Sequence, residues 1–309
     1  MSIIKVIDIA YVRFSAPDLD RMRAFLLDFG LRESGDNSPD ILRMRGSGDA
    51  PFIHVTEKGE STFRGIGLYA ESLEALDDIA IAAGAEKRPI DAPGGGWMVR
   101  LVDPDGFEVD VVAGQARAAQ LVPDPTPWND AREHRRTGLP KRLPPGPSNV
   151  VRLGHAVMLV ADLAQSWRWW SEHFGLLVSD EVRDPDGQSI ALFIRCDRGS
   201  IPTDHHTLNF AQAPAGVAQF HHAAFEVADL DSLMTGHDHL AGAGHGHMWG
   251  VGRHILGSQV FDYWQDPFGN KIEHWTDGDL LSAEAGSSVQ DIAAMIGGQW
   301  GPAIPEGFV

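Results

Sequence analysis

The pattern of apolar and polar positions occurs twice along the chain. Residues 7–33 contain an alternating apolar segment, a turn with Asp-Leu and a helical pattern that ends in Phe-Gly-Leu; residues 151–181 repeat this order. In the second copy the large apolar residues from Leu163 to Phe174 recur at i, i+4, i+7 and i+11, which places them on one face of a helix. Asp162 precedes them as an N-cap. Each segment is therefore predicted to form a strand followed by an amphipathic helix.

The repeat continues beyond these helices. Residues 61–76 align with 218–233, and residues 103–112 align with 266–275, where a DPxG turn leads into an alternating strand in both copies. An internal repeat of this kind indicates a duplicated structural unit. The sequence predicts an α+β fold of four βαβββ modules, paired into two domains that are each an open, mixed, barrel-like sheet with helices outside.

The predicted domain boundaries follow the repeat and the proline distribution. The N-terminal domain covers residues 1–113 and the C-terminal domain covers 150–280. Residues 114–149 are rich in proline and charge and are predicted to be a linker, because proline removes backbone donors. Residues 281–309 form a tail whose apolar side chains favour packing on the body or on a neighbouring subunit.

Composition restricts the class of partner. The net charge is −18 and the pI is about 5.0, so the long-range field repels nucleic acid and anionic membranes. Cys196 is the single cysteine, which fits a reducing compartment. No uninterrupted apolar run approaches the roughly 20 residues of a membrane helix. We expect a cytoplasmic protein with neither nucleic-acid nor membrane partners, and a homo-oligomer is plausible from the apolar tail.

The functional information lies where the two copies differ. Three potential metal ligands in the second copy align with residues of other types in the first copy. The aligned pairs are Tyr11 and His155, Gly65 and His222, and Asp110 and Glu273. Two imidazoles and one carboxylate form the facial triad that leaves coordination positions open on Fe(II). The shared scaffold folds without these ligands in the first copy, so the second copy is predicted to bind a metal.

The segments around these ligands resemble a known family. GHAVML with His155, FHHAAFEV with His222 and DPFGNKIEHW with Glu273 are similar to motifs of type I extradiol dioxygenases, which belong to the vicinal-oxygen-chelate (glyoxalase–bleomycin-resistance) superfamily. The resemblance covers residues 5–113 and 150–280. It implies Fe(II), with Mn(II) possible, O2 as co-substrate, and a small aromatic diol or triol whose ring is cleaved beside its hydroxyls. The N-terminal domain would lack metal ligands.

Three further residues follow from the same resemblance. TDHHTLNF resembles the family's His-x-Thr segment and points to His205 as the acid/base group. GRHILGS points to His254 as a hydrogen-bond donor to substrate, and the spacing before Glu273 identifies Tyr263 as the active-site tyrosine. Adjacent strand residues face opposite ways, so only one of His205 and His206 can be the acid/base group, and His205 is favoured.

The sequence departs from carboxylate-binding relatives at one place. Where those enzymes carry an arginine before the Gly-Arg-His segment, this chain has GAGHGHMWGVGRH, with His247 and Trp249. We therefore expect a substrate without a side-chain carboxylate, in a pocket formed by Trp249, His247, Arg253 and His206. The remaining histidines of this region are interpreted as loop residues around glycine: His237, His239 and His245.

Alternative functions stay open at this point. A glyoxalase-like isomerase or epimerase would use the same scaffold, with Zn, Ni or Co and more carboxylate ligands. A metal-free small-molecule binding protein of the superfamily would not need the histidine set. A 2-oxoacid-dependent oxygenase shares the triad, but such enzymes are usually longer. The ligand set with His205, His254 and Tyr263 favours ring cleavage.

Overall fold

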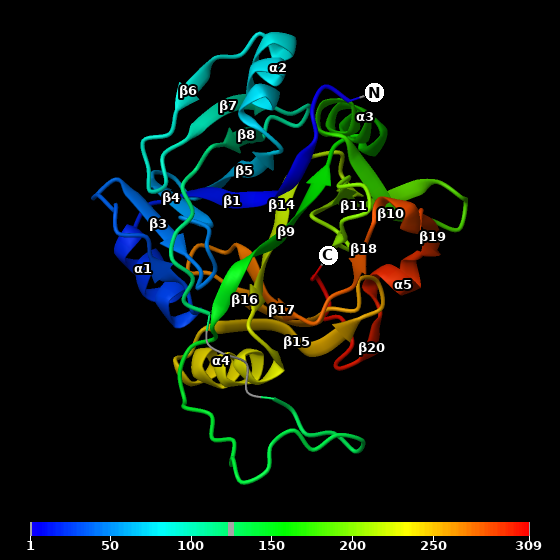
Figure 1. The fold of residues 1–309 in the computed structure, drawn as a ribbon. Helices are drawn as coiled ribbons and strands as arrows, with labels where there is room; N and C mark the ends of the chain where they lie inside the picture. Colours follow the sequence, from blue (N-terminus) through cyan, green and yellow to red (C-terminus); the bar gives the residue numbers. More distant parts are fainter. Residues whose placement is uncertain (1, 123–126, 309) are drawn as a thin grey trace.

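The computed structural model describes residues 2–122 and 127–308. It is an α+β fold in which two large open mixed sheets carry helices on their outer faces (Figure 1). The predicted fold class is confirmed. In the described ranges, no helix is both long and apolar enough to cross a membrane.

The first sheet is built from the N-terminal third of the chain. Its strand order is β2-β3-β4-β1-β5-β8-β7-β6. The elements are β1 (Val6–Ala16), α1 (Leu19–Asp28), β2 (Arg32–Glu33), β3 (Ile41–Arg45), β4 (His54–Lys58), β5 (Thr62–Ala70), α2 (Leu73–Ala83), β6 (Lys87–Pro89), β7 (Trp97–Val102) and β8 (Glu108–Ala113).

The second sheet has ten strands in the order β19-β10-β11-β13-β9-β14-β17-β16-β15-β20. Its main elements are β9 (Val150–Val160), α3 (Leu163–Phe174), β10 (Leu176–Arg183), β11 (Ser189–Cys196), β13 (Leu208–Gln212), β14 (Gln219–Val227), α4 (Leu230–Gly242), β15 (Gly246–His254), β16 (Val260–Gln265) and β17 (Lys271–Thr276). A separate two-stranded sheet pairs β12 (Thr203–Asp204) with β18 (Leu280–Leu281).

The two large sheets share one internal plan. In the first, β1 pairs in parallel with β4 and antiparallel with β5, which pairs in parallel with β8. In the second, β9 has the same relations to β13 and β14, and β14 to β17. The repeat in the sequence is therefore a repeat in topology, and equivalent positions can be compared strand by strand.

Local sequence explains the helix that covers the second sheet. The Asp162 carboxylate accepts a hydrogen bond from the Gln165 N–H at the start of α3, and Gly175 ends the helix with φ 61° in the left-handed region. Trp170 and Phe174 are completely buried. The helical stripe seen in the sequence thus packs into the core.

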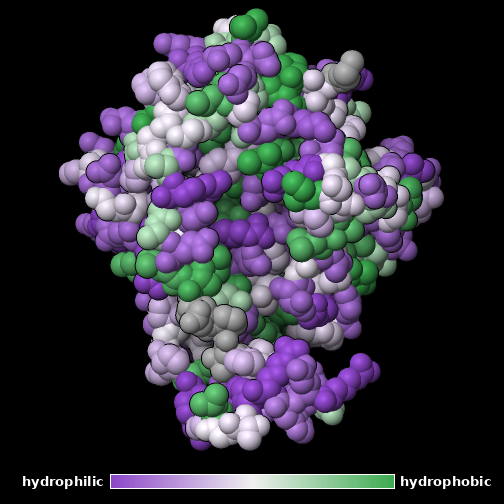
Figure 2. Space-filling view, viewed as in Figure 1, coloured by the Kyte–Doolittle hydropathy of each residue, from purple (hydrophilic) through white to green (hydrophobic). Residues whose placement is uncertain are grey.

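The C-terminal tail packs on its own chain. It contains η1 (Ala283–Ala285), β19 (Ser288–Asp291), α5 (Ile292–Ile296) and β20 (Gly298–Trp300). β19 adds to β10 and β20 adds to β15, so the tail extends both edges of the second sheet. The segment before β9 runs past α4 at the lower end of the molecule in Figure 1, and this end is largely hydrophilic in Figure 2.

His54 on β4 gives the fold a pH-dependent stability. The side chain is 1% exposed and stacks on Phe14 with ring centroids 5.1 Å apart. Burial lowers the pKa of His54 to about 3. The unfolded chain therefore binds a proton below about pH 6.5 that the native protein does not. Stability is lost as the pH falls from there toward the folded pKa.

We expect this single group to remove about 2 kcal/mol of unfolding free energy between about pH 7.5 and about pH 5. Urea unfolding of wild type and His54→Gln at both pH values measures it. The variant is expected to be less stable at both pH values because the buried position is repacked. The loss of unfolding free energy between the two pH values is expected to be smaller in the variant by about 2 kcal/mol. Equal losses in the two proteins would contradict the assignment.

Candidate active site

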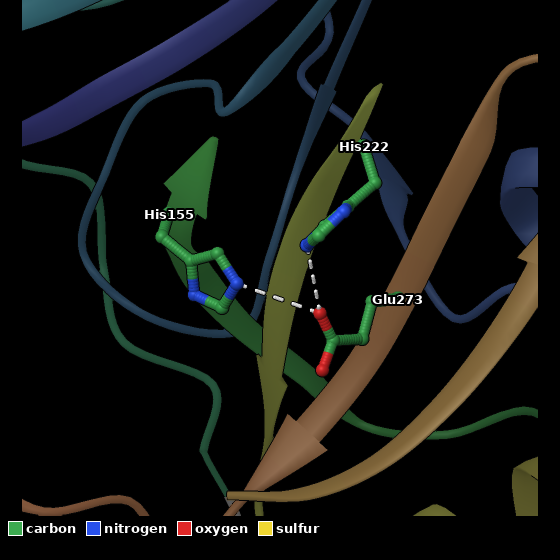
Figure 3. A group of neighbouring side chains, drawn as sticks. All are labelled: His155, His222 and Glu273. Carbon is green, nitrogen blue, oxygen red and sulfur yellow. Dashed lines mark ion pairs between the residues drawn. The ribbon is translucent and has the colours of Figure 1, made fainter. Parts of the chain in front are cut away.

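Three neighbouring strands bring His155, His222 and Glu273 together. His155 on β9 pairs with Ala224 on β14, and Ala224 pairs with Glu273 on β17. His222 lies two residues earlier on β14, on the same face. The Glu273 Oε2 atom is 3.4 Å from His155 Nε2 and 3.3 Å from His222 Nε2, as Figure 3 shows. The sequence-predicted ligands therefore converge.

The triad has the properties of a metal site. All three side chains are buried, and neither Glu273 carboxylate oxygen has a hydrogen-bond partner among the residues that the structure describes. Burial acts to raise the pKa of Glu273, but the His155 and His222 imidazoles outweigh it and hold the pKa well below its usual range. Buried charge without hydrogen bonds is costly unless a cation is bound. Donor atoms 3.3–3.4 Å apart fit ligands about 2.0–2.2 Å from one ion.

The orientation of His222 is fixed by its neighbour. Its Nδ1 atom lies 2.6 Å from Nδ1 of His221, in hydrogen-bond contact. This contact leaves the Nε2 atom of His222 free to face Glu273. A ligand imidazole that is held through its second nitrogen is the usual arrangement in metal sites.

The matching position in the N-terminal sheet is filled by ion pairs. Tyr11 pairs with Gly67 as His155 pairs with Ala224, so Tyr11 and Asp110 occupy the places of His155 and Glu273. The Tyr11 hydroxyl donates to Asp110 Oδ2 at 2.9 Å, and the Arg100 Nε–H donates to Oδ1 at 2.6 Å. At Gly65, φ is 151° and an added Cβ would lie 1.8 Å from a backbone oxygen. This copy has Tyr11 and Gly65 in place of the two histidines, and its carboxylate is satisfied by protein groups.

A cavity of about 110 Å³ opens beside the triad. It is lined by His155, Val157, Leu159, Phe193, His206, Asn209, Ala211, His221, His222, Trp249, His254, Leu256, Tyr263, Met295, Ile296, Ile304 and Phe308. These lining residues include no lysine, arginine, aspartate or glutamate. The cavity therefore suits a largely apolar molecule that reaches the imidazoles and the tyrosine at one side.

The structure brings His206, rather than His205, to this cavity. The His206 ring lies 4.2 Å from the His155 ring. His205 lies behind it: its Nδ1 is 3.1 Å from His206 Nδ1, and its Nε2 is 2.8 Å from Asp180 Oδ2. The two histidines lie in a bend between β12 and β13 rather than on a strand, so the alternation expected from the sequence does not apply, and His206 in place of the favoured His205 lines the cavity.

His254 and Tyr263 line the cavity together with Trp249. The His254 Nε2 and Tyr263 hydroxyl are 3.0 Å apart, and the Tyr263 ring lies 5.2 Å from the His222 ring. Burial lowers the pKa of His254 to about 4. Burial, with the nearby Glu273 carboxylate, raises the pKa of Tyr263 well above its usual range. At neutral pH the pair is a neutral imidazole and a neutral phenol that share one hydrogen bond.

Two expected pocket residues lie elsewhere. The Nε2 of His247 is 2.9 Å from Asp262 Oδ1, behind the cavity wall. Arg253 donates to Asp277 Oδ2 at 2.7 Å and is directed away from the cavity. A β-bulge between His247 and Trp249 explains the first difference, because it breaks the two-residue alternation of side chains.

The tail supplies cavity residues that the sequence did not place. Met295, Ile304 and Phe308 line the cavity. The Phe308 carbonyl accepts a hydrogen bond from Lys271, and the Trp249 Nε1–H donates to the Pro302 carbonyl at 3.0 Å. The apolar character of the tail predicted that it packs on other residues, but the sequence did not indicate that these residues surround the cavity.

Comparisons with known proteins agree with this geometry. Residues 152–274 match the family model described as the Glyoxalase/Bleomycin resistance protein/Dioxygenase superfamily. The matched residues contain all three ligands of the triad, His155, His222 and Glu273. The chain is also homologous to Metapyrocatechase 2 of Cupriavidus necator, with 28% identity over 312 residues, 97% of this chain and 91% of that protein.

Two solved structures have the same fold as this chain. Homoprotocatechuate 2,3-dioxygenase from Brevibacterium fuscum superposes with a TM-score of 0.79 and 17% identity, over 99% of this chain and 92% of that one. The Mn(II)-bound glyoxalase from Novosphingobium aromaticivorans superposes with 0.80 and 24%, over 98% and 94%. A protein named as a dioxygenase and one named as a glyoxalase share this fold, so the fold does not decide between these two activities and the site residues must.

Proposed function

We propose that this chain is an extradiol dioxygenase that uses Fe(II) and O2 to cleave a catechol-type or trihydroxylated aromatic ring beside its hydroxyls. One observation carries the proposal. The buried triad of His155, His222 and Glu273 lies beside an apolar cavity that is lined by its two histidines and by His206, His254 and Tyr263. The homology to a metapyrocatechase supports the same substrate class.

His155, His222 and Glu273 would hold the metal through one atom each. When bound, the Fe(II) ion supplies open coordination positions, a Lewis acid that lowers the pKa of the phenolic hydroxyls, and electrons for O2 activation. Mn(II) has the same ligand preference, and the donor set admits both ions.

The other cavity residues position the substrate and move protons. His206 is the imidazole that faces the triad, so it accepts a proton from the substrate hydroxyl and returns it later as a general acid. His205 holds the His206 ring from behind and is itself held by Asp180. His254 and Tyr263 offer hydrogen bonds to the substrate oxygens, where negative charge develops.

The cavity lining defines the substituents that fit. Trp249, Leu256, Met295 and Phe308 form apolar walls, and Arg253 is paired with Asp277 outside the cavity. A ring carboxylate would be buried there without a cationic partner, which is unfavourable. The substrate is therefore a diol or triol whose other substituents are apolar or absent.

Oxygen consumption with a panel of aromatics tests the function. Protein purified anaerobically and loaded with Fe(II) is mixed with unsubstituted, alkyl-substituted and carboxylated catechols. We expect equimolar consumption of O2 and catechol with a yellow ring-opened product, fastest for the uncharged substrates. His155→Ala is expected to abolish turnover. Tyr11→Phe, the matched position in the N-terminal sheet, retains it. Absence of turnover across the panel, together with isomerase activity on Zn or Ni loading, would overturn the proposal.

A further inference from the structure

A second convergence of imidazoles and a carboxylate lies behind the wall of the cavity. His237 on α4, His247 on β15 and Asp262 on β16 each offer one ligand atom, and these atoms all lie within 4.8 Å of one another. The His247 Nε2 atom is 2.9 Å from Asp262 Oδ1, and the His237 Nδ1 atom contacts both carboxylate oxygens, at 3.2 Å from Oδ1 and 3.1 Å from Oδ2. Both imidazoles therefore contact the same carboxylate.

The carboxylate of this cluster is buried and held in place. Asp262 is 0% exposed, and the Trp264 Nε1–H donates to its Oδ2 at 2.6 Å. Across the described residues, no lysine or arginine forms a salt bridge with Asp262. Both imidazoles contact this carboxylate, and a cation shared by all three groups would stabilise the buried charge.

A cluster with the same residue types differs in its burial and its geometry. The His239 Nε2 atom is 3.1 Å from Asp28 Oδ1, and the His245 Nε2 atom is 2.9 Å from Asp28 Oδ2. The Asp28 side chain is 39% exposed, so these contacts are ordinary hydrogen bonds to a solvated carboxylate. Among the described residues, the three ligand atoms of the Asp262 cluster all lie within 4.8 Å of one another, and those of the Asp28 cluster do not.

The donor set selects the kind of ion. Two imidazoles and one carboxylate oxygen are ligands of Zn²⁺ and similar divalent ions, whereas Mg²⁺ and Ca²⁺ prefer oxygen ligands alone. Donor separations of 2.9–3.2 Å fit ligands about 2.0–2.2 Å from one ion. The His237 and His247 side chains are 25% and 33% exposed, so solvent reaches the cluster and can supply a fourth ligand.

We propose that His237, His247 and Asp262 form a second divalent-metal site for Zn²⁺ or a similar ion, distinct from the catalytic triad. The site joins helix α4 to the β15–β16 hairpin. Tyr263 follows Asp262 on β16 and points to the opposite face, into the cavity, where it pairs with Trp249 of β15. The bound ion therefore braces the hairpin that forms one wall of the active site.

Metal stoichiometry in matched variants tests the site. Full-length protein is dialysed against Zn²⁺, and bound zinc is measured by elemental analysis. We expect two ions per chain in wild type and in His245→Gln, and one in His247→Gln. Glu273→Gln also retains one ion, and the double variant Glu273→Gln/His247→Gln retains none. If the catalytic triad bound no zinc, wild type and His245→Gln would bind one ion and His247→Gln none, whereas Glu273→Gln would still bind one, so failure of either proposal gives a different set of counts.

A second measurement covers the case in which His247→Gln does not fold. Asp262→Asn keeps the shape of the side chain and an acceptor oxygen for Trp264. In the Glu273→Gln background, Zn²⁺ is expected to raise the Tm, and Asp262→Asn is expected to remove that shift. The proposal is overturned if His247→Gln and His245→Gln bind equal amounts of zinc, or if the Tm shift persists in Asp262→Asn.

Discussion

Replacement of His206 by asparagine is expected to lower kcat by about 10²–10⁴-fold, the usual contribution of a positioned acid/base group. The ring faces His155 across 4.2 Å and lines the cavity. It is not one of the three metal ligands, so Fe(II) binding and KM are expected to change little. A fall in kcat with unchanged KM indicates that a group acting in the transition state has been removed.

His205→Asn is the matched control for His206→Asn. His205 contacts His206 at 3.1 Å and Asp180 at 2.8 Å and does not line the cavity. As a positioning residue it is expected to have a smaller effect on kcat. Steady-state kinetics of both variants, with iron content measured in each, distinguish the two imidazoles. A larger loss in His205→Asn than in His206→Asn would reverse the assignment.

The difference between these two histidines shows what sequence alone could establish. The repeat located His155, His222 and Glu273 because each has a counterpart in the first copy at the same strand position. His205 and His206 precede β13 in a bent segment, so alternation gave two candidates and no means of choosing. Only the packing against His155 and Asp180 distinguishes them.

Other parts of the site depend on contacts that no local pattern records. His237 and His239 were interpreted as loop residues, yet they lie within α4 and face two different carboxylates. Asp28 comes from α1, more than two hundred residues earlier. The cavity wall from Phe308 likewise forms across the fold. Such contacts follow from the tertiary arrangement of elements that the sequence predicted one by one.

Asp110 and Glu273 occupy equivalent places in the two sheets, but loss of charge has a different consequence at each. Asp110 accepts from Tyr11 and Arg100 and lies 3.6 Å from Arg13. Asp110→Asn removes the charged partner of the part-exposed Arg100 and weakens the network around the buried Arg13. Breaking a fully buried pair typically costs about 3–5 kcal/mol, and the partial exposure of Arg100 places the expected cost at or below the lower end of that range. Metal binding at the other sheet is expected to be unaffected.

Glu273→Gln is expected to abolish turnover and Fe(II) binding at the triad. The substitution replaces a carboxylate oxygen by an amide NH2 group, which donates hydrogen bonds and does not bind a cation. Wild type gains about 2.7 kcal/mol from the triad when free Fe(II) is a hundred times its Kd there, and Glu273→Gln should lose this contribution. Anaerobic urea unfolding of both variants, with and without Fe(II), measures this. An iron-dependent gain in Glu273→Gln equal to that of wild type would show that Glu273 is not a ligand.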